Sequence, residues 1–375
     1  MKIIFPLVGD SVGGSHWSVI ELYKELIKAD FEVLIVLHQA DNKLAEFLKK
    51  KNIDFVFFPI GRLAGESPNI LKIFLRVLLN SYKIYTFIKK HKVHIVHGND
   101  LRINLTWSLP VKLARKKFIW HQRTILSPSL FWRAIPFLCN HFIAISNTVM
   151  STAPKNINPI KKNTITNPFD TTYVYDYEIS NQWLKKKYKV KSKYKLIGYV
   201  GRLQSYKNIS FLIKAVDILI RSDVRDVKLF IVGDGPSVYV DELKQLVADL
   251  KIEKHIVFTG FISNPLKVIA GLDVLVAPST IDAFGRTLIE AMLQNTPTIA
   301  ANSAGHTEII SNGFTGLHYK HGDIGNLVRE LNFFLQKCPI ETRKTNRART
   351  IAVNQYSAYK HSTRIIKIYQ KVLSQ

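Results

Sequence analysis

Two carboxylates, Asp282 and Glu290, lie in the segment PSTIDAFGRTLIEAML and have the types and spacing for binding chemistry. A helix beginning near Gly285 would leave Asp282 in the preceding loop and place Glu290 a turn or more inside the helix, so both can face one ligand. A carboxylate is a two-point acceptor for the vicinal hydroxyls of a ribose or a sugar. The structural alternative is an N-cap Asp and a solvated helix Glu.

Two cations, Arg202 and Lys207, flank a predicted strand-to-helix turn in GYVGRLQSYKN. Arginine binds phosphate in a bidentate manner and lysine acts as a point charge, so the pair fits a diphosphate. In a lysine-rich chain, plain surface charge is the alternative. Gly13 and Gly14 in GDSVGGSHW precede a helix and would let backbone N–H groups approach an anion, although glycine serves ordinary chain reversal equally well.

The elements that must position these residues alternate between short apolar runs and amphipathic runs. This alternation predicts an α/β protein with two Rossmann-like, doubly wound domains facing across a cleft. In such sheets ligands bind beyond the carboxyl ends of the strands. The predicted strands are 3–8, 32–37, 94–98, 118–122 and 142–146, then 194–201, 227–233, 255–260, 273–279 and 296–302; the predicted helices are 15–29, 43–50 and 70–90, then 207–221, 238–250, 264–270, 285–294 and 323–337.

The length of 375 residues exceeds the size at which one core keeps growing, which favours two domains. We predict an N-terminal domain over 1–169, a linker over 170–192 and a C-terminal domain over 193–355. The final segment, 356–375, has helical spacing and no acidic residue, and we expect it to join the N-terminal domain.

Apolar residues make up 47% of the chain and charged residues 22%, the balance of a folded protein. Cys139 and Cys338 have no His or Cys at metal-ligand spacing, so we expect buried thiols in a reducing compartment. No cleavable leader and no run of about 18 apolar residues is visible, which predicts a cytoplasmic protein that does not span a membrane.

Taken in order, the glycine pair, GRL-x4-KN, VGDGP, FTGF and D-x-FG-x4-E resemble the motifs of the GT-B retaining glycosyltransferases of family 4, also called glycosyl transferases group 1. That group includes many lipopolysaccharide, capsule and mannosyl transferases. The resemblance implies transfer of a sugar from a UDP- or GDP-linked donor to a glycan acceptor, lipid-linked, in bacterial surface polysaccharide synthesis. It implies no cofactor besides the nucleotide-sugar donor.

The resemblance also implies roles for single residues. Arg202 and Lys207 would hold the donor diphosphate, and Glu290 would hydrogen-bond the ribose. His121 would lie beside the reacting sugar. The remaining implied donor-binding residues are Gly13 and Gly14, which close over the diphosphate; Ala283, Phe284, Gly285 and Arg286, whose backbone N–H groups face the phosphates and sugar; and Gly233, Gly260 and Phe261 near the base.

Asp282 departs from the family, which has Glu at this position in contact with donor-sugar hydroxyls. The shorter side chain retracts the carboxylate by about 1.5 Å, one C–C bond. We therefore expect Asp282 to influence donor-sugar specificity.

For the mechanism, fixed cations and a helix N-terminus can stabilise the leaving diphosphate without a metal ion, and no Asp-x-Asp motif is apparent. No residue stands out as a nucleophile, which favours attack on the same face as departure. In this scheme His121 positions and polarises and does not attack.

Positive charge is concentrated in the N-terminal half: the net charge is +25, and the stretch 101–169 has ten Lys and Arg residues and no acid. Within 70–90, Lys72, Arg76, Asn80 and Lys83 recur opposite a predicted apolar face of Ile70, Ile73, Phe74, Val77 and Leu78. Together with Leu126, Leu130, Phe131, Trp132 and Arg133, this basic helix predicts peripheral binding to anionic lipid. An ordinary sheet-covering helix with a solvated face is the alternative.

Three other functions share features with parts of the sequence. A pI near 9.9 fits nucleic-acid binding, but no recognised binding signature is present and carboxylates in the site would repel phosphates, so we expect no nucleic-acid partner. A nucleotide-sugar epimerase would share the fold, and a phosphorylase would need a cofactor-bearing lysine that the sequence does not single out.

Overall fold

The apolar runs form two parallel sheets in a computed structural model of the chain, which describes residues 1–10, 12–39, 43–61, 63–64, 69–222, 224, 226–336 and 342–375. The chain divides into unit 1, Met1–Asp170 with Tyr356–Gln375, and unit 2, Thr171–Gln355. Cys338, expected to be a buried thiol, lies outside the described residues. Cys139 is half-buried, and burial raises the pKa of its thiol to about 12.

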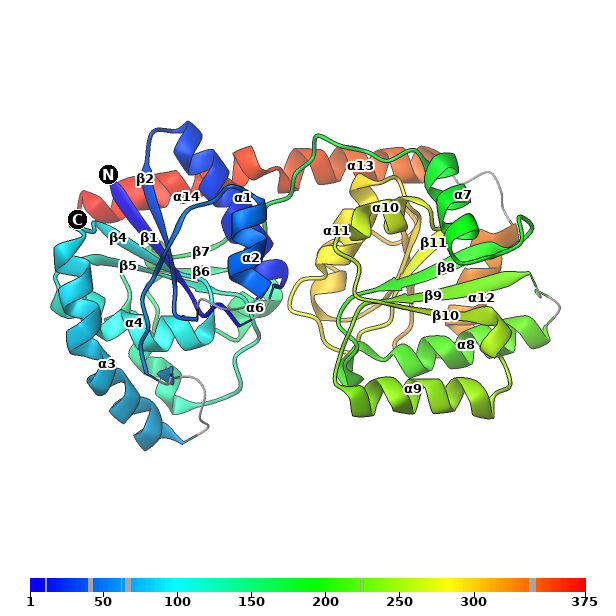
Figure 1. Ribbon diagram of the computed structural model, residues 1–375, viewed down its shortest axis with the longest axis horizontal. Helices are drawn as coiled ribbons and strands as arrows, with labels where there is room; N and C mark the ends of the chain where they lie inside the picture. The colour runs from blue at the N-terminus through cyan, green and yellow to red at the C-terminus, as the bar shows by residue number, and fades with distance from the viewer. Residues whose placement is uncertain are drawn as a thin grey trace. The chain divides into compact units, whose positions relative to one another are not determined.

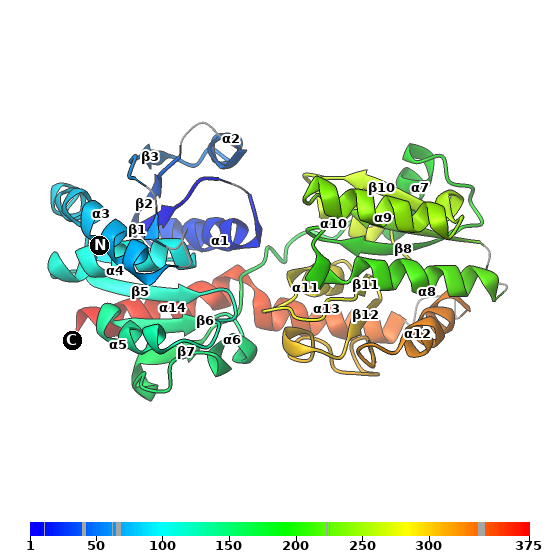
Figure 2. The same cartoon turned by 90° about the horizontal axis from the view of Figure 1, so that it is seen from below.

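Unit 1 contains a seven-stranded sheet in the order β3-β2-β1-β4-β5-β6-β7 (Figure 2). Its core strands are β-branched and apolar, and each recorded strand pair is parallel. The strands are β1 Lys2–Leu7, β2 Glu32–Leu37, β3 Phe55–Phe57, β4 Ile95–Gly98, β5 Lys117–Gln122, β6 His141–Ala144 and β7 Lys162–Thr164.

Helices cover both faces of this sheet (Figure 1). Apolar side chains of α1 (Gly14–Lys28), α2 (Lys43–Lys50) and α14 (Ala358–Leu373) share one core with the strands. On the other face, α3 (Ile70–Lys90) packs along α4 (Leu101–Leu113). The short helices α5 (Ile135–Leu138) and α6 (Asn147–Ser151) complete the unit.

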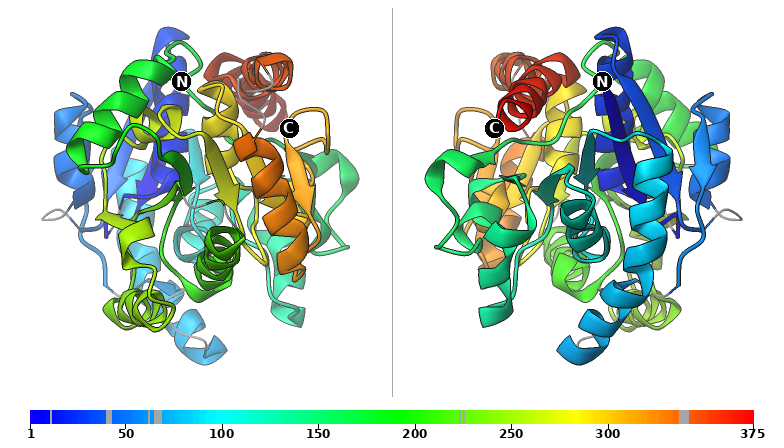
Figure 3. Two further views of the ribbon diagram at one scale, coloured as in Figure 1. Left: turned by 90° about the vertical axis from the view of Figure 1, so that its right-hand side faces the viewer. Right: turned by 90° about the vertical axis from the view of Figure 1, so that its left-hand side faces the viewer.

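Unit 2 repeats the plan with a six-stranded sheet in the order β10-β9-β8-β11-β12-β13. Helices α8, α9 and α12 share one core with its strands, and α7, α10 and α11 cover the opposite face (Figures 1 and 3). The strands are β8 Lys195–Val200, β9 Val227–Val232, β10 Ile256–Gly260, β11 Val274–Ala277, β12 Thr298–Ala301 and β13 Leu317–Tyr319; the helices are α7 Tyr177–Lys187, α8 Ile209–Arg221, α9 Ser237–Asp249, α10 Pro265–Ala270, α11 Arg286–Leu293, α12 Ile324–Gln336 and α13 Thr342–Tyr356.

The predicted fold class, two doubly wound α/β domains, is confirmed. The strands that sequence analysis did not predict, β3, β7 and β13, have three residues each and lie at sheet edges. Edge strands are buried on fewer sides, so their sequences need not be continuous apolar runs.

The segment 170–192, expected to be a linker, instead contains α7, which packs on α10 in unit 2. The Asn181 amide donates to the Gly271 carbonyl at 2.8 Å, and the Tyr177 hydroxyl donates to Asp273 at 3.0 Å. A Cβ on Gly271 would lie 2.7 Å from the Ser180 backbone, so glycine permits this close approach.

In both sheets the strand order reverses at one point: between β1 and β4 in unit 1, and between β8 and β11 in unit 2. Loops that leave neighbouring strands at such a topological switch point turn away from each other and open a crevice at the carboxyl ends, where ligands bind in open α/β sheets. We therefore expect the ligand-binding residues in the loops that follow these four strands.

Candidate active site

The glycine-rich loops of unit 2 pack directly on one another. The Gly233 N–H donates to the Gly260 carbonyl at 3.0 Å, and the Leu203 N–H donates to the Asp234 carbonyl at 2.9 Å. Gly233 has φ +138°, and a Cβ there would lie 1.8 Å from the Gly201 carbonyl oxygen. Gly233 is thus required by loop packing, whereas Phe261 is 69% exposed.

Across the switch point of unit 2, the loops after β8 and β11 meet in an ion pair. Lys207 Nζ lies 2.6 Å from Asp282 Oδ2, and both side chains are more than four-fifths buried. The loops are also joined by the Thr280 N–H, which donates to the Tyr206 carbonyl at 3.1 Å. Arg202, on the same β8 loop, is exposed and forms no ion pair with any residue in the described ranges.

Asp282 is held ionised by its neighbours. Burial alone would raise the pKa of its carboxyl, but the His306 ring and the Lys207 ammonium outweigh burial and hold the pKa well below the ordinary value. His306 Nε2 lies 3.6 Å from Asp282 Oδ2, and the His306 side chain is almost fully buried. The carboxylate is therefore charged at neutral pH and presents acceptor oxygens.

Helix α11 begins directly after this loop. Its N-cap, Gly285, has φ +95°, a conformation that favours glycine. The Phe284 side chain is 3% exposed, so the residue anchors the loop in the core. Arg286, the first residue of α11, forms an ion pair at 3.4 Å with Glu290, one turn further along, and both side chains are less than one-fifth exposed.

The turn at 303–306 packs against the Asp282 loop. Sequence analysis did not assign this turn to the site. The Gly305 N–H donates to the Asp282 carbonyl at 3.0 Å, and a Cβ on Gly305 would lie 2.8 Å from the Phe284 backbone nitrogen. His306 Cδ2 would lie 3.0 Å from a Cβ on Gly285. The available signal was the small-residue run SAG before His306, which permits this close packing.

In unit 1, the predicted glycine pair caps α1. Gly13 is the N-cap with φ −139°, and its N–H donates to His16 Nδ1 at 3.0 Å. The Ser18 hydroxyl has two acceptors in reach, the Gly14 carbonyl at 3.0 Å and Asn167 Oδ1 at 3.2 Å. The Gly13 N–H is thus engaged by its own helix.

His121 lies at the carboxyl end of β5 and is fully buried. Its Nδ1 is 3.1 Å from Nε2 of His97, which ends β4 and is also fully buried. Beside them the Arg123 guanidinium donates to Asn99 Oδ1, at 2.6 Å from one terminal nitrogen, and to Asn167 Oδ1. Arg123, Asn99 and Asn167 were not singled out in the sequence because each is a lone polar residue after a strand.

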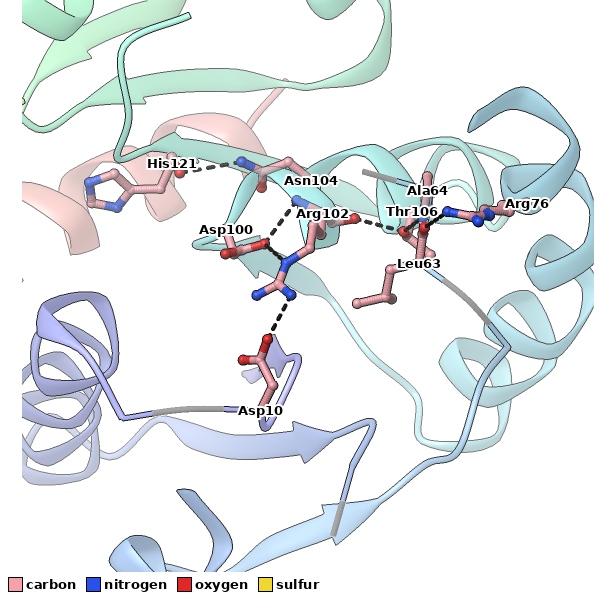
Figure 4. Close-up of polar contacts among 9 residues, drawn as sticks. All are labelled: Asp10, Leu63, Ala64, Arg76, Asp100, Arg102, Asn104, Thr106 and His121. Atoms are coloured by element: carbon pink, nitrogen blue, oxygen red, sulfur yellow. Dashed lines mark hydrogen bonds and ion pairs between the residues drawn. The ribbon is translucent and has the colours of Figure 1, made fainter. Parts of the chain in front are cut away.

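The switch point of unit 1 also carries charged residues that sequence analysis missed. Figure 4 shows Asp10, after β1, and Asp100, after β4, on either side of Arg102. Arg102 reaches Asp10 at 2.7 Å and Asp100 at 3.2 Å, while Asp100 caps α4. The same view shows the Asn104 side chain against the His121 backbone carbonyl, at 3.3 Å. The two acids neutralise Arg102 and tie together the loops after β1 and β4.

The helix predicted to be basic and amphipathic matches the expected faces only in part. Asn80 is 4% exposed and Arg76 donates to the Leu63 carbonyl, so these two predicted polar positions pack inward, whereas Lys72 and Lys83 are exposed.

Of the predicted apolar face, Val77 is buried and Phe74 and Leu78 are exposed. Of the additional residues expected at the surface, Leu126 is buried and Leu130 is exposed. The exposed apolar residues of α3 are Leu71, Phe74, Leu75, Leu78, Leu79 and Tyr82, at 48 to 77% exposure.

Two features are absent from the described part of the chain. No helix there is long and apolar enough to cross a membrane. No group of three or more His, Cys, Asp and Glu side chains in those residues is arranged to hold a metal ion.

The geometry therefore defines a two-domain α/β protein with polar groups gathered at its switch points. Residues 12–173 match the family model described as glycosyltransferase family 4, and residues 181–354 match the model described as glycosyl transferases group 1. The chain belongs to this glycosyltransferase family, as its motifs predicted.

Relatives and solved structures agree with this assignment. N-acetyl-alpha-D-glucosaminyl L-malate synthase of Bacillus anthracis is 26% identical over 61% of the chain and 59% of its own length. A capsular polysaccharide biosynthesis glycosyltransferase, CapM of Staphylococcus aureus, is 27% identical over 48% of each chain. The chain thus spans about half the length of these curated relatives. The crystal structure of Anabaena HepE in complex with UDP and glucose superposes with a TM-score of 0.85, 22% identity and 99% coverage of both chains.

Proposed function

We propose that the enzyme transfers a sugar, with retention of anomeric configuration, from a nucleotide-diphosphate donor to a glycan acceptor. The observation that carries the proposal is the arrangement at the switch point of unit 2. Loops after β8 and β11 bring Lys207, Asp282 and the N-terminus of α11 together at the carboxyl ends of the strands. Open α/β sheets bind ligands at this place.

The charges at this switch point suit a diphosphate. Arg202 is exposed after β8, and Lys207 lies on the same loop, so two cations are available for phosphate oxygens. Helix α11 adds the partial positive charge and N–H groups of its first turn, which begins at Gly285. These fixed groups would stabilise the charge that develops on the leaving diphosphate, without a metal ion.

The carboxylates suit hydroxyl groups. Asp282 is ionised and has a second carboxylate oxygen besides the one facing Lys207, and Glu290 lies one turn along α11. Each can accept hydrogen bonds from vicinal hydroxyls, Glu290 from the ribose and Asp282 from the sugar. Because Asp282 is already bonded to Lys207, we assign it to sugar binding and not to nucleophilic attack, which favours same-face transfer.

The donor and the acceptor are inferred from proteins of the same fold or family. HepE is seen with UDP and glucose, which supports a UDP-linked donor over a GDP-linked one. CapM is named for capsular polysaccharide biosynthesis, which supports an acceptor in bacterial surface polysaccharide synthesis.

The exposed apolar row of α3 supports attachment to a membrane surface and a lipid-linked acceptor. Leu75, Leu79 and Tyr82 are exposed on a helix that also exposes Lys72 and Lys83. Apolar side chains flanked by lysines insert at the boundary of anionic headgroups and acyl chains. We propose a peripheral location on the inner face of the cell membrane.

Thermal stabilisation by UDP-, GDP-, ADP- and CMP-sugars tests the donor site, since ligand binding to the native state raises the melting temperature. One nucleotide class should stabilise the wild type, and Lys207→Ala and Glu290→Ala should abolish the shift. The exposed Lys214→Ala on α8 and Glu242→Ala on α9 are matched controls. Equal shifts in all variants would refute the donor site, and donor conversion without any acceptor would indicate an epimerase.

A further inference from the structure

A cavity of about 870 Å³ lies within unit 1, away from the switch point between β1 and β4. Its walls come from two segments, 127–133 after β5 and 152–156 after α6. Strands β5 and β6, which precede these segments, are neighbours in the sheet (Figure 2). Sites for small ligands have volumes of about 300–1,000 Å³, so the cavity is large enough for a substituted sugar.

Hydrogen bonds hold the walls of this cavity in place. The Trp132 indole N–H donates to the Ser127 carbonyl at 2.8 Å and closes the first segment on itself. The Asn156 side-chain amide donates to the Arg133 carbonyl at 2.9 Å and joins the second segment to the first. Because the walls are fixed before a ligand arrives, binding requires little ordering of the chain.

The charge along the cavity wall is positive. Arg133 and Lys155 line the cavity, are exposed, and form no ion pair or side-chain hydrogen bond with any residue in the described ranges. None of the described residues that line the cavity is acidic. The stretch 101–169, which contains both walls, has ten Lys and Arg residues and no Asp or Glu, so it offers no carboxylate to neutralise the two cations.

Neutral side chains add directional and apolar contacts. Ser127 and Ser129 bring hydroxyl groups to the wall; Ser129 Oγ accepts from the Phe131 N–H at 3.2 Å, which leaves its proton available to a ligand. The Trp132 N–H is already bonded to Ser127, so the indole offers a ligand only its apolar aromatic surface. An aromatic surface suits the C–H groups of a sugar ring, whereas the cations and hydroxyls suit an anionic substituent.

We propose that this cavity binds the phosphate group of a phosphorylated sugar, so that the acceptor glycan carries a phosphate. Arginine binds two phosphate oxygens at once and lysine adds a point charge. A carboxylate has only two oxygens and one charge for the same two cations and two hydroxyls. The inference rests on the proposed function, which requires a glycan acceptor, and names the chemical class of that acceptor. Phospholipid headgroups share the phosphate chemistry, so the experiments must separate the two sources.

Fluorine resonances of the full chain labelled with fluorotryptophan report on the cavity locally. Trp132 lines it, and Trp132→Phe identifies the resonance. We expect glucose 1-phosphate to shift this resonance, glucose to leave it unmoved and glucuronate to bind at least tenfold more weakly. Trp183 on α7 is the internal control, because Nζ of Lys187 and of Lys267 lie 5.1 Å and 4.5 Å from its ring centroid.

Two outcomes of this titration would overturn the proposal. An equal shift of the Trp183 resonance would indicate adventitious binding of anions to surface charge. Equal affinity for glucuronate and the sugar phosphate would contradict the assignment to phosphate. An unmoved Trp132 resonance refutes the cavity by itself, whereas the donor proposal fails separately if no nucleotide sugar stabilises the protein.

Charge variants separate the cavity from the donor site. Arg133→Gln and Lys155→Gln should each raise the dissociation constant for the sugar phosphate, measured at Trp132, about tenfold, because each removes a charge-assisted hydrogen bond. Arg115→Gln, at an exposed position of unit 1 that does not line the cavity, is the matched control and should change nothing. Lys207→Ala should also leave this constant unchanged; loss of the shift in that variant would place the phosphate in the donor site and refute the cavity.

Vesicle sedimentation distinguishes a glycan phosphate from a lipid headgroup. The double variant Arg133→Gln, Lys155→Gln should bind phosphatidylglycerol vesicles as well as the control Arg115→Gln, Lys161→Gln, which removes the same charge from exposed positions outside the cavity. Weaker binding of the cavity variant than of this control would assign the cavity to a lipid headgroup and overturn its assignment to the glycan.

Discussion

Buried histidines near the switch points of the two units have different partners. In unit 2, buried His306 lies beside an ion pair between Lys207 and Asp282, and the group is charged. In unit 1, His97 and His121 at the ends of β4 and β5 are buried, neutral and bonded to each other. The same doubly wound architecture positions both groups.

This difference bears on the chemistry that each group can perform. A diphosphate needs fixed positive charge and helix N–H groups, which the β8 and β11 loops and α11 supply. The neutral imidazoles of unit 1 supply directional donors and acceptors and no fixed charge. The fold fixes where a ligand binds, and the side chains after each strand fix its chemistry.

Replacing Lys207 by alanine should give the largest effect. The ammonium would be lost from the diphosphate site, and removal of one such electrostatic group costs about 10²–10³ in rate. Steady-state kcat/KM for transfer, normalised to the folded fraction, measures this. Lys214→Ala, at an exposed position on α8, should retain wild-type activity. A decrease in kcat/KM of less than threefold in Lys207→Ala would contradict the assignment of this ammonium to the diphosphate site of unit 2.

Acidification should destabilise unit 1 before unit 2. Burial lowers the pKa of His97, His121 and His361, so the unfolded chain binds more protons than the native state below pH 6.5. Their contribution is intact above pH 6.5 and declines as the pH falls toward the folded values, by about 1.4 kcal/mol per histidine per pH unit. For these three histidines together, we expect the free energy of unfolding to fall by roughly 3–4 kcal/mol between pH 6 and pH 5. Asp282, with its lowered pKa, loses its contribution only below about pH 4.

Hydrogen exchange of β4 and β5 compared with β8 and β11, corrected for intrinsic rates, measures this order. The variant His361→Leu removes one titrating group, so the pH slope of stability should fall by about 1.4 kcal/mol per pH unit, whereas exposed His321→Leu should leave it unchanged. Loss of protection in β8 and β11 first would contradict the assignment of unit 1 as the acid-sensitive half.

Much of the fold could be predicted from the periodicity of apolar residues and from composition. The run EVLIVL predicted β2 over the residues that the structure assigns, and helix α3 was likewise predicted from 70–90. Buried central strands are continuous apolar runs, so they are visible in sequence. The three-residue edge strand KNT has no such run, because one side of an edge strand has no neighbouring strand.

The sites were less accessible to sequence reasoning. Asp282 and Lys207, 75 residues apart, were both proposed, yet their contact depends on strand order, which periodicity does not reveal. The contacts of α14 with the buried histidines of β4 and β5, which are Tyr369 with His97 and His361 with His121, gave no signal, because helical spacing with isolated polar residues is also typical of an ordinary surface helix. In α3, apolar residues lie around much of the helix, so the pattern did not decide which face packs: Val77 is buried as expected, whereas Asn80 is buried and Leu78 exposed against expectation.

The contrast between units extends to their surfaces. Unit 1 exposes the apolar row of α3 beside lysines, and the double variant Leu75→Ser, Leu79→Ser should weaken binding to anionic phospholipid vesicles about tenfold, since less apolar area is buried. Vesicle sedimentation measures this. Val238→Ser, on exposed α9 of unit 2, is the control and should bind like wild type. Binding that is unaffected by the α3 variant would assign lipid attachment to another surface.

The substitution with the smallest expected effect, Asp282→Glu, tests how Asp282 contributes to specificity for the donor sugar. Asp282→Glu keeps the charge that pairs with Lys207 at 2.6 Å but advances the carboxylate by about 1.5 Å, restoring the residue usual in the family. The nucleotide alone should bind as before, while the ratio of kcat/KM between two donor sugars should change about threefold to tenfold, because the carboxylate meets a different set of hydroxyls. Asp282→Asn keeps the length and loses the charge, so it should lower activity with every donor and leave the ratio nearly constant. If the Glu variant changes all donors equally, Asp282 acts on the diphosphate through Lys207 and not on the sugar.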